Sequence, residues 1–76
     1  SEYHKFLSAV DYYENTALTN AGLITKTANE QLANGSINYL EWAQLVNQAA
    51  TIRLQYTDAV YNLNNTAIQL NNFLEN

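Results

Sequence analysis

The sequence has no cysteine, no proline and only two glycines. Without cysteine there can be no disulfide framework and no thiol chemistry. With no proline and so little glycine, the chain has few residues that end a helix easily. These absences favour long helices, with any turn confined to a short, identifiable stretch.

Charge is also scarce. Charged residues make up 13% of the 76 residues, with three basic against seven acidic side chains and a net charge of −4. Nucleic-acid binding needs clustered lysine and arginine, so nucleic acid is not an expected partner. No apolar run is long enough to cross a bilayer, so we expect no membrane span. The length permits one small domain, expected to be a fragment or extension of a larger protein.

One stretch, residues 32–42, carries both a helix-stop and a helix-start signal. Gly35 can adopt the left-handed conformation that closes a helix, which predicts a turn at Asn34–Ile37. Three residues further on, the Asn38 side chain can accept from the Glu41 backbone N–H while the Glu41 side chain reaches back to the Asn38 N–H. This capping box predicts that a second helix starts at Asn38.

Apolar residues before the turn recur every three or four positions, as in one face of a helix. The row is Phe6, Val10, Tyr13, Ala17, Ala21, Ile24, Ala28 and Leu32. Its eleven-residue repeat favours a nearly straight or slightly right-handed arrangement of helices over an ordinary left-handed coiled coil. Gly22 interrupts this helix and marks either a bend or a close contact between helices.

Beyond the turn, the pattern is closer to a heptad repeat. One seam position holds Trp42, Ala49, Tyr56, Leu63 and Leu70, and the other holds Leu45, Ile52, Ala59 and Phe73. A second apolar row lies on an adjoining face: Leu40, Ala43, Ala50, Leu54, Tyr61 and Ile68. A helix in a simple hairpin needs one apolar stripe, so two rows predict neighbours on two sides.

We therefore predict an all-α fold made of two long antiparallel helices in a coiled-coil-like hairpin spanning residues 1–76. Helix 1 is expected at about 3–34, the turn at 35–37 and helix 2 at about 38–74. The predicted packing residues are Val10, Tyr13, Ile24, Trp42, Leu45, Ile52, Tyr56, Leu63 and Leu70. A hairpin of this size cannot cover its own apolar surface, so association with copies of itself or with neighbouring hairpins is expected.

Groups that could carry chemistry are few. His4 is the sole histidine and lies near the chain start, where too few other ligands converge to hold a metal. Asp11, Glu14 and Glu30 are interpreted as exposed helix charges. We predict no catalytic, cofactor-binding or metal-binding residue, and no enzyme activity.

The segment from Gly35 to Trp42, followed by Tyr56, Ala59, Tyr61, Ala67 and Leu70, resembles the periplasmic-tip repeat of TolC-like outer membrane efflux factors. The run from Tyr12 to Asn15 adds a resemblance to the TolC-like C-terminal extension of some heavy-metal efflux pumps of the resistance-nodulation-division class. Together these similarities cover nearly the whole chain.

The resemblance implies a periplasmic location, associated with the cell envelope of a Gram-negative bacterium. In that family, hairpins line up into a conduit, and the glycine turn meets a periplasmic adaptor protein that connects to the pump. The implied partner-binding tip is Asn34, Gly35, Ser36 and Ile37, with Asn38 and Glu41 as helix caps. The implied function is non-catalytic, in the export of metal ions or small solutes.

A different class of function also fits the pattern. The chain could be a self-associating interaction module, a hairpin that dimerises into a four-helix bundle and has no connection with transport. The flanking sequence and the oligomeric state would separate the two readings.

Overall fold

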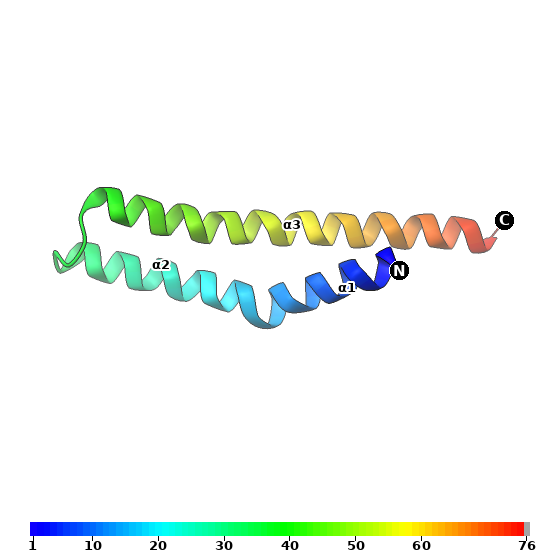
Figure 1. Ribbon diagram of the computed structural model, residues 1–76, viewed down its shortest axis with the longest axis horizontal. Coiled ribbons are helices and arrows are strands. Elements are labelled where there is room, and N and C mark those ends of the chain that lie inside the picture. The colour runs from blue at the N-terminus through cyan, green and yellow to red at the C-terminus, as the bar shows by residue number, and fades with distance from the viewer. Residues whose placement is uncertain (76) are drawn as a thin grey trace.

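The chain forms two helical arms joined by a short connection at residues 34–38 (Figure 1). The computed structural model describes residues 1–75, and every regular element among them is helical. The first arm comprises α1 (Glu2–Tyr12), a π-helix η1 (Tyr13–Ala17) and α2 (Leu18–Ala33), and the second arm is α3 (Tyr39–Glu75). The all-α prediction is confirmed, and each predicted arm boundary lies within one residue of the observed one.

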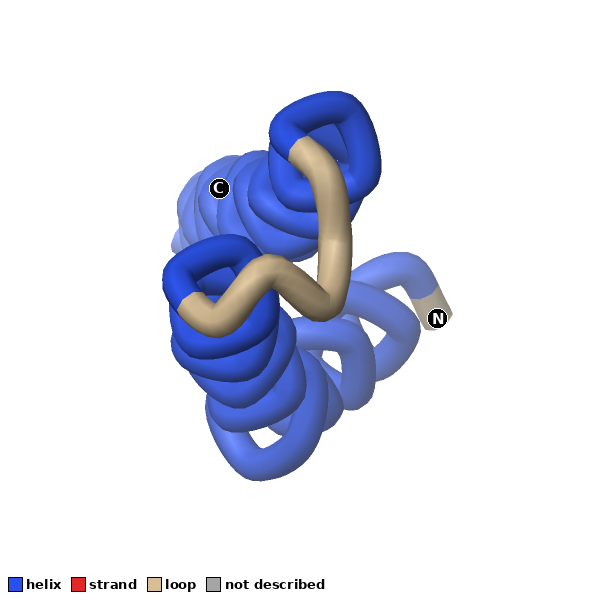
Figure 2. The backbone as a smooth tube through the Cα atoms, turned by 90° about the vertical axis from the view of Figure 1, so that its left-hand side faces the viewer, coloured by secondary structure: helices blue, strands red, loops and turns tan. Residues whose placement is uncertain are grey.

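The two arms lie side by side and give the molecule a rod shape (Figures 1 and 2). Its principal extents are 61 × 19 × 14 Å. α2 packs on the first part of α3, and α1 packs on a later part. The C-terminal end of α3 extends past the start of α1, where Phe73 and Leu74 are 76% and 73% exposed.

The first arm is not a straight helix. At η1 the helix widens for one turn, and the backbone N–H of Leu18 donates to the carbonyl of Tyr13, five residues earlier. The Asn15 side-chain amide donates to the Asp11 carbonyl at 3.0 Å and to the Asp11 carboxylate at 2.7 Å. The arm bends at this point (Figure 1). The helical arm expected at about 3–34 is therefore present, but a π-turn at residues 13–17 divides it into two α-helices.

Gly22 does not mark the bend. It lies within α2, is exposed, and a Cβ built on it would meet no atom within 4 Å. Neither reason considered for this glycine, a bend or a close helix contact, is therefore present at its position.

Small side chains dominate the contact between the arms. The buried apolar residues are Val10, Ala17, Ala21, Ala28, Ala49 and Ala59. Among the described residues no large side chain is fully buried. Alanine at the contact allows two helix axes to approach toward the short end of the usual range of about 8–10 Å. The arms are thus held by close backbone approach along an alanine seam, with larger side chains half-buried beside it.

Candidate functional site

The connection between the two arms, which we call the tip, is built from local hydrogen bonds. Gly35 has φ +79°, and its N–H donates to the Leu32 carbonyl while the Ser36 N–H donates to the Gln31 carbonyl. These two bonds form the Schellman arrangement that satisfies the last carbonyls of a helix. The Asn34 side-chain oxygen accepts from both the N–H and the hydroxyl of Ser36. The tip is therefore a defined structure, with Asn34, Gly35 and Ser36 exposed and Ile37 half-buried.

Both hydrogen bonds expected of the capping box are present. The Glu41 N–H donates to the Asn38 side-chain oxygen at 2.8 Å, and the Asn38 N–H donates to the Glu41 carboxylate at 3.1 Å. Asn38 is the cap rather than the first helical residue, so α3 begins at Tyr39. The Glu41 carboxylate also lies in the first turn of α3, where the helix dipole stabilises negative charge.

The two glycines are expected to respond in opposite ways to replacement by alanine. Gly35→Ala should destabilise the hairpin by about 1 kcal/mol or more, because a side chain is strained at φ +79°. Gly22→Ala should stabilise it by roughly 0.5–1 kcal/mol, because the position is an open site within a helix. Urea unfolding followed by circular dichroism measures both. A stabilising Gly35→Ala would contradict the left-handed tip.

Just beyond the tip, an indole joins the two arms. The Trp42 ring N–H donates to the Asn29 side-chain oxygen at 2.8 Å, which links α3 to α2. The ring of Tyr39 lies 5.3 Å from the indole, centroid to centroid. Trp42 is half-buried, whereas Tyr39 is 71% exposed. This contact fixes the arms next to the tip.

A second polar contact joins the arms at the π-turn. The Tyr56 hydroxyl of α3 donates to the Glu14 carboxylate at 2.8 Å, and the Tyr13 hydroxyl donates to the Gln55 side-chain oxygen at 3.3 Å. The rings of Tyr13 and Tyr56 lie 6.2 Å apart. We call these four residues the waist. Glu14 is exposed, as expected of a helix charge, and it also contacts the opposite arm.

The Glu14 contact raises the pKa of Tyr56 above its ordinary value of 10.0, chiefly through the hydrogen bond, with smaller contributions from burial and from the negative charge. The neutral phenol is favoured in the folded state. Stability from this contact is thus complete below pH 10 and is lost as pH rises through the raised pKa. The NMR chemical shift of the Tyr56 ζ-carbon, followed across alkaline pH, should show that this hydroxyl deprotonates above pH 10.0. Glu14→Gln should move it back toward 10.0, and an unchanged titration would refute the contact.

The predicted packing residues occupy the contact between the arms, with one exception. Val10 is buried, and Tyr13, Ile24, Trp42, Leu45, Ile52, Tyr56 and Leu63 are half-buried. Leu70 is 46% exposed and is not buried between the arms, so its place in a helix-packing interface stays a prediction. It lies near the end of the first arm, where only Ser1–Tyr3 remain opposite it and line a shallow pocket with it.

A row of large apolar side chains faces away from the first arm. Leu40, Leu54, Tyr61 and Ile68 are between 59% and 67% exposed. They occupy one heptad position of α3, roughly opposite the seam that faces α1 and α2. We call this side of α3, from Leu40 to Asn71, the outer face. Its large residues belong to the second apolar row that the sequence pattern indicated, but the row lies roughly opposite the seam rather than on an adjoining face. Among residues 1–75 nothing covers these four large side chains.

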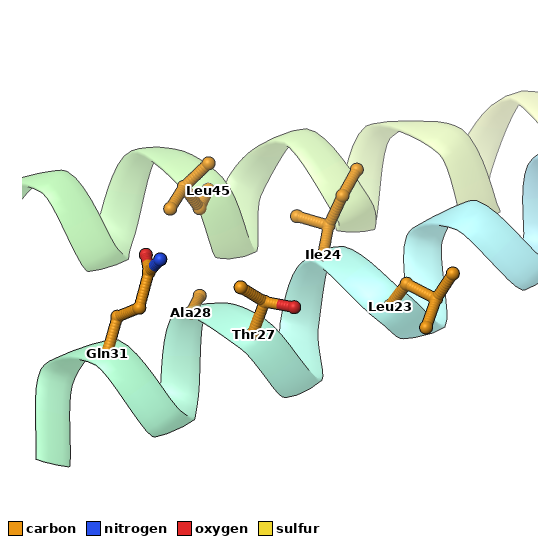
Figure 3. Close-up of a pocket in the computed structure, with 6 residues that line it drawn as sticks. All are labelled: Leu23, Ile24, Thr27, Ala28, Gln31 and Leu45. Carbon is orange, nitrogen blue, oxygen red and sulfur yellow. The ribbon is translucent and has the colours of Figure 1, made fainter. Parts of the chain in front are cut away.

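The hollows between the arms are open and shallow. The one in Figure 3 has a volume of about 290 Å³ and is lined by Leu23, Ile24, Thr27, Ala28, Gln31 and Leu45. Leu45 of α3 lies opposite Ala28 of α2 there (Figure 3). Such an open, largely aliphatic surface offers few polar groups to fix the orientation of a small ligand.

Residues 1–75 contain no group of three or more His, Cys, Asp or Glu side chains placed to hold a metal ion. At the chain start, the His4 ring nitrogen Nδ1 lies 2.9 Å from the Ser1 hydroxyl. None of the helices within these residues combines the length and the hydropathy that a membrane span requires.

The turn, the caps and the packing positions of Tyr13 and Tyr56 were predicted from the sequence, but the waist hydrogen bonds to Gln55 and Glu14 were not. The one available signal was the pair of adjacent tyrosines before Glu14, which gives two hydroxyls and a carboxylate within three positions. That signal does not show that the Tyr13 and Glu14 side chains contact residues of the opposite arm.

Comparisons with protein-family models, with curated proteins and with solved structures find no match for this chain. Its function is therefore inferred from the tip, the waist and the outer face.

Proposed function

We propose that the chain is a non-catalytic element of a TolC-like efflux system, working as an antiparallel, coiled-coil-like hairpin that assembles side by side with other hairpins. The observation that carries this proposal is the outer face of α3. Four large apolar side chains on one row are each at least 59% exposed. Such a row is stabilised when a neighbouring helix covers it.

The position of the row supports an element that packs between two neighbours in a wall of helices. Because the outer face and the inner seam lie on opposite sides of α3, this helix can contact its own first arm on one side and a neighbour on the other. Repeating that relation from hairpin to hairpin gives a wall of helices. The uncharged asparagine, glutamine and threonine side chains on the remaining faces suit a wall in contact with water.

The tip supports a docking role. Its backbone is fixed by the Gly35 and Ser36 hydrogen bonds and by the capping box, so a partner meets a preformed surface. By the resemblance described above, that partner is a periplasmic adaptor protein, and a resistance-nodulation-division pump supplies the energy. The exported cargo is metal ions or small solutes.

Site-specific photo-crosslinking in the cell of origin tests this function. A photo-reactive amino acid at Ser36 should crosslink to a periplasmic adaptor protein, identified by mass spectrometry. The same probe at Lys26, an exposed side chain of α2 away from the tip, serves as the control. Removing the chain should increase sensitivity to the exported metal ions or solutes. A chain that is found outside the cell envelope, or that crosslinks to no adaptor, would exclude the efflux function.

A further inference from the structure

The outer face carries two parallel heptad rows of different size. The first row holds large residues and one asparagine: Leu40, Asn47, Leu54, Tyr61 and Ile68. The second, three positions later in each heptad, holds small or polar residues: Ala43, Ala50, Thr57, Asn64 and Asn71. All ten are exposed except Ala43, which is half-buried. A helix that docks here must therefore place small residues against the first row and large ones against the second.

The chain itself supplies such a helix when a second copy runs in the opposite direction. We propose that the outer face of α3 pairs with the same face of a second copy, antiparallel, about a two-fold axis between Gln55 and Tyr56. A two-fold contact is self-complementary, so each pair of facing residues occurs twice.

The facing residues fit this register. Tyr61 meets Ala50 of the second copy, Ile68 meets Ala43, Leu54 meets Thr57, Leu40 meets Asn71, and Asn47 meets Asn64. Large residues face smaller ones, which keeps the distance between the helices even. The two inner asparagines meet each other, so each amide has a polar partner rather than an apolar one.

A parallel pairing fits less well. With the helices parallel and in register, Tyr61 would meet Tyr61 and Ala50 would meet Ala50, so wide and narrow layers would alternate. The dipoles of two long α3 helices would also be aligned, which is unfavourable, whereas antiparallel dipoles attract. Neither row contains a charged residue between Leu40 and Asn71. The chain has a net charge of −4, but none of that charge lies in the two rows, so like charges within the rows do not oppose the pairing.

The size of the contact sets the expected strength. From Leu40 to Asn71 the face is about 46 Å long at 1.5 Å per residue. A strip about 10 Å wide on each copy amounts to roughly 900 Å² in total, below the 1,200 Å² or more of stable complexes. The pairing is therefore expected to be reversible, with a dissociation constant in the micromolar range or weaker.

This pairing stands independently of the efflux assignment, although it uses the same face of α3. It places the two tips at opposite ends of the dimer, whereas hairpins in a conduit point the same way. A copy paired in this way has no free outer face for a neighbouring hairpin, so the pair is the form of the chain outside a side-by-side assembly.

Sedimentation equilibrium over a range of concentrations tests the pairing. The unmodified chain should pass from monomer to dimer as concentration rises. Leu54→Asp should weaken dimerisation at least tenfold, because it places a charge at the centre of the face. Leu23→Asp is the matched control, a leucine of α2 that is 56% exposed where Leu54 is 67% exposed. It should leave the dissociation constant unchanged, and circular dichroism should show equal helix content in both variants.

Cysteine crosslinking tests the direction, since the chain has no cysteine of its own. Oxidising a mixture of the Asn47→Cys and Asn64→Cys proteins should give mostly mixed dimers. Asn47→Cys alone should give few crosslinks, whereas a parallel pair would crosslink it readily.

A chain that stays monomeric at every concentration overturns the pairing, as does equal weakening by Leu23→Asp or efficient crosslinking of Asn47→Cys with itself. None of these results bears on adaptor crosslinking at Ser36, so the two proposals can fail separately.

Discussion

Replacing Ala49 by leucine is expected to destabilise the hairpin by about 1–3 kcal/mol or more. Ala49 is 0% exposed, as are Ala21 and Ala28 of α2. Because Ala49 is fully enclosed, the added carbons must displace neighbouring atoms, which forces the arms apart and weakens the contacts beside them. A chain of this size has only several kcal/mol of total stability. Urea unfolding followed by circular dichroism measures the loss.

The neighbouring residue provides the control. Ala50 is exposed on the outer face, so Ala50→Leu should change the free energy of unfolding by no more than about 0.5 kcal/mol at low protein concentration, where any dimer is dissociated. Equal losses for the two variants would mean that the seam is not closely packed. A loss at Ala49 alone supports the alanine contact.

Trp42→Ala should be the other severe substitution, with a loss of about 2–3 kcal/mol. Fully buried aromatic residues lose roughly 3–5 kcal/mol on truncation, and Trp42 is only half-buried. Truncation removes both the ring that packs between the arms and the hydrogen bond to Asn29. Hydrogen exchange should show the greatest loss of protection near the tip, because the waist contacts remain.

Two further variants separate the causes. Trp42→Phe keeps an aromatic ring but removes the N–H donor, so it should cost about 0.5–1.5 kcal/mol. Phe73→Ala removes an aromatic ring that is 76% exposed and should have an effect within about 0.5 kcal/mol. If Trp42→Ala were as mild as Phe73→Ala, the indole would not join the arms.

The tip could be predicted from the sequence because its chemistry is local. A left-handed glycine, an asparagine cap and a glutamate three residues later specify their hydrogen bonds whatever the rest of the chain does. All of these bonds lie within residues 31–41, and the structure contains each of them. The seam rows were predictable for a related reason, since apolar spacing reports which face of a helix is covered.

The π-turn could not be predicted in the same way. Residues Tyr13 to Ala17 contain neither glycine nor proline, and their spacing is compatible with an ordinary α-helix. What distinguishes the π-turn is an extra residue in one turn, and no residue type in this stretch marks it. The Glu14 side chain in this turn accepts a hydrogen bond from Tyr56 of α3, a contact distant in the sequence. Periodicity also did not show that alanines would be the most buried residues while the leucines and tyrosines beside them stay half-exposed.

The alanine seam also has a thermal consequence. Unfolding a protein raises its heat capacity chiefly by exposing apolar surface, typically by about 12–15 cal/mol/K per residue. Here the buried residues are mostly alanines, whose side chain is a single methyl group, and many of the large apolar side chains are already exposed to solvent in the native state. The heat-capacity increment should therefore fall below that range. The result is a flat stability curve and a broad melting transition, in which calorimetry would register a small step between the two baselines.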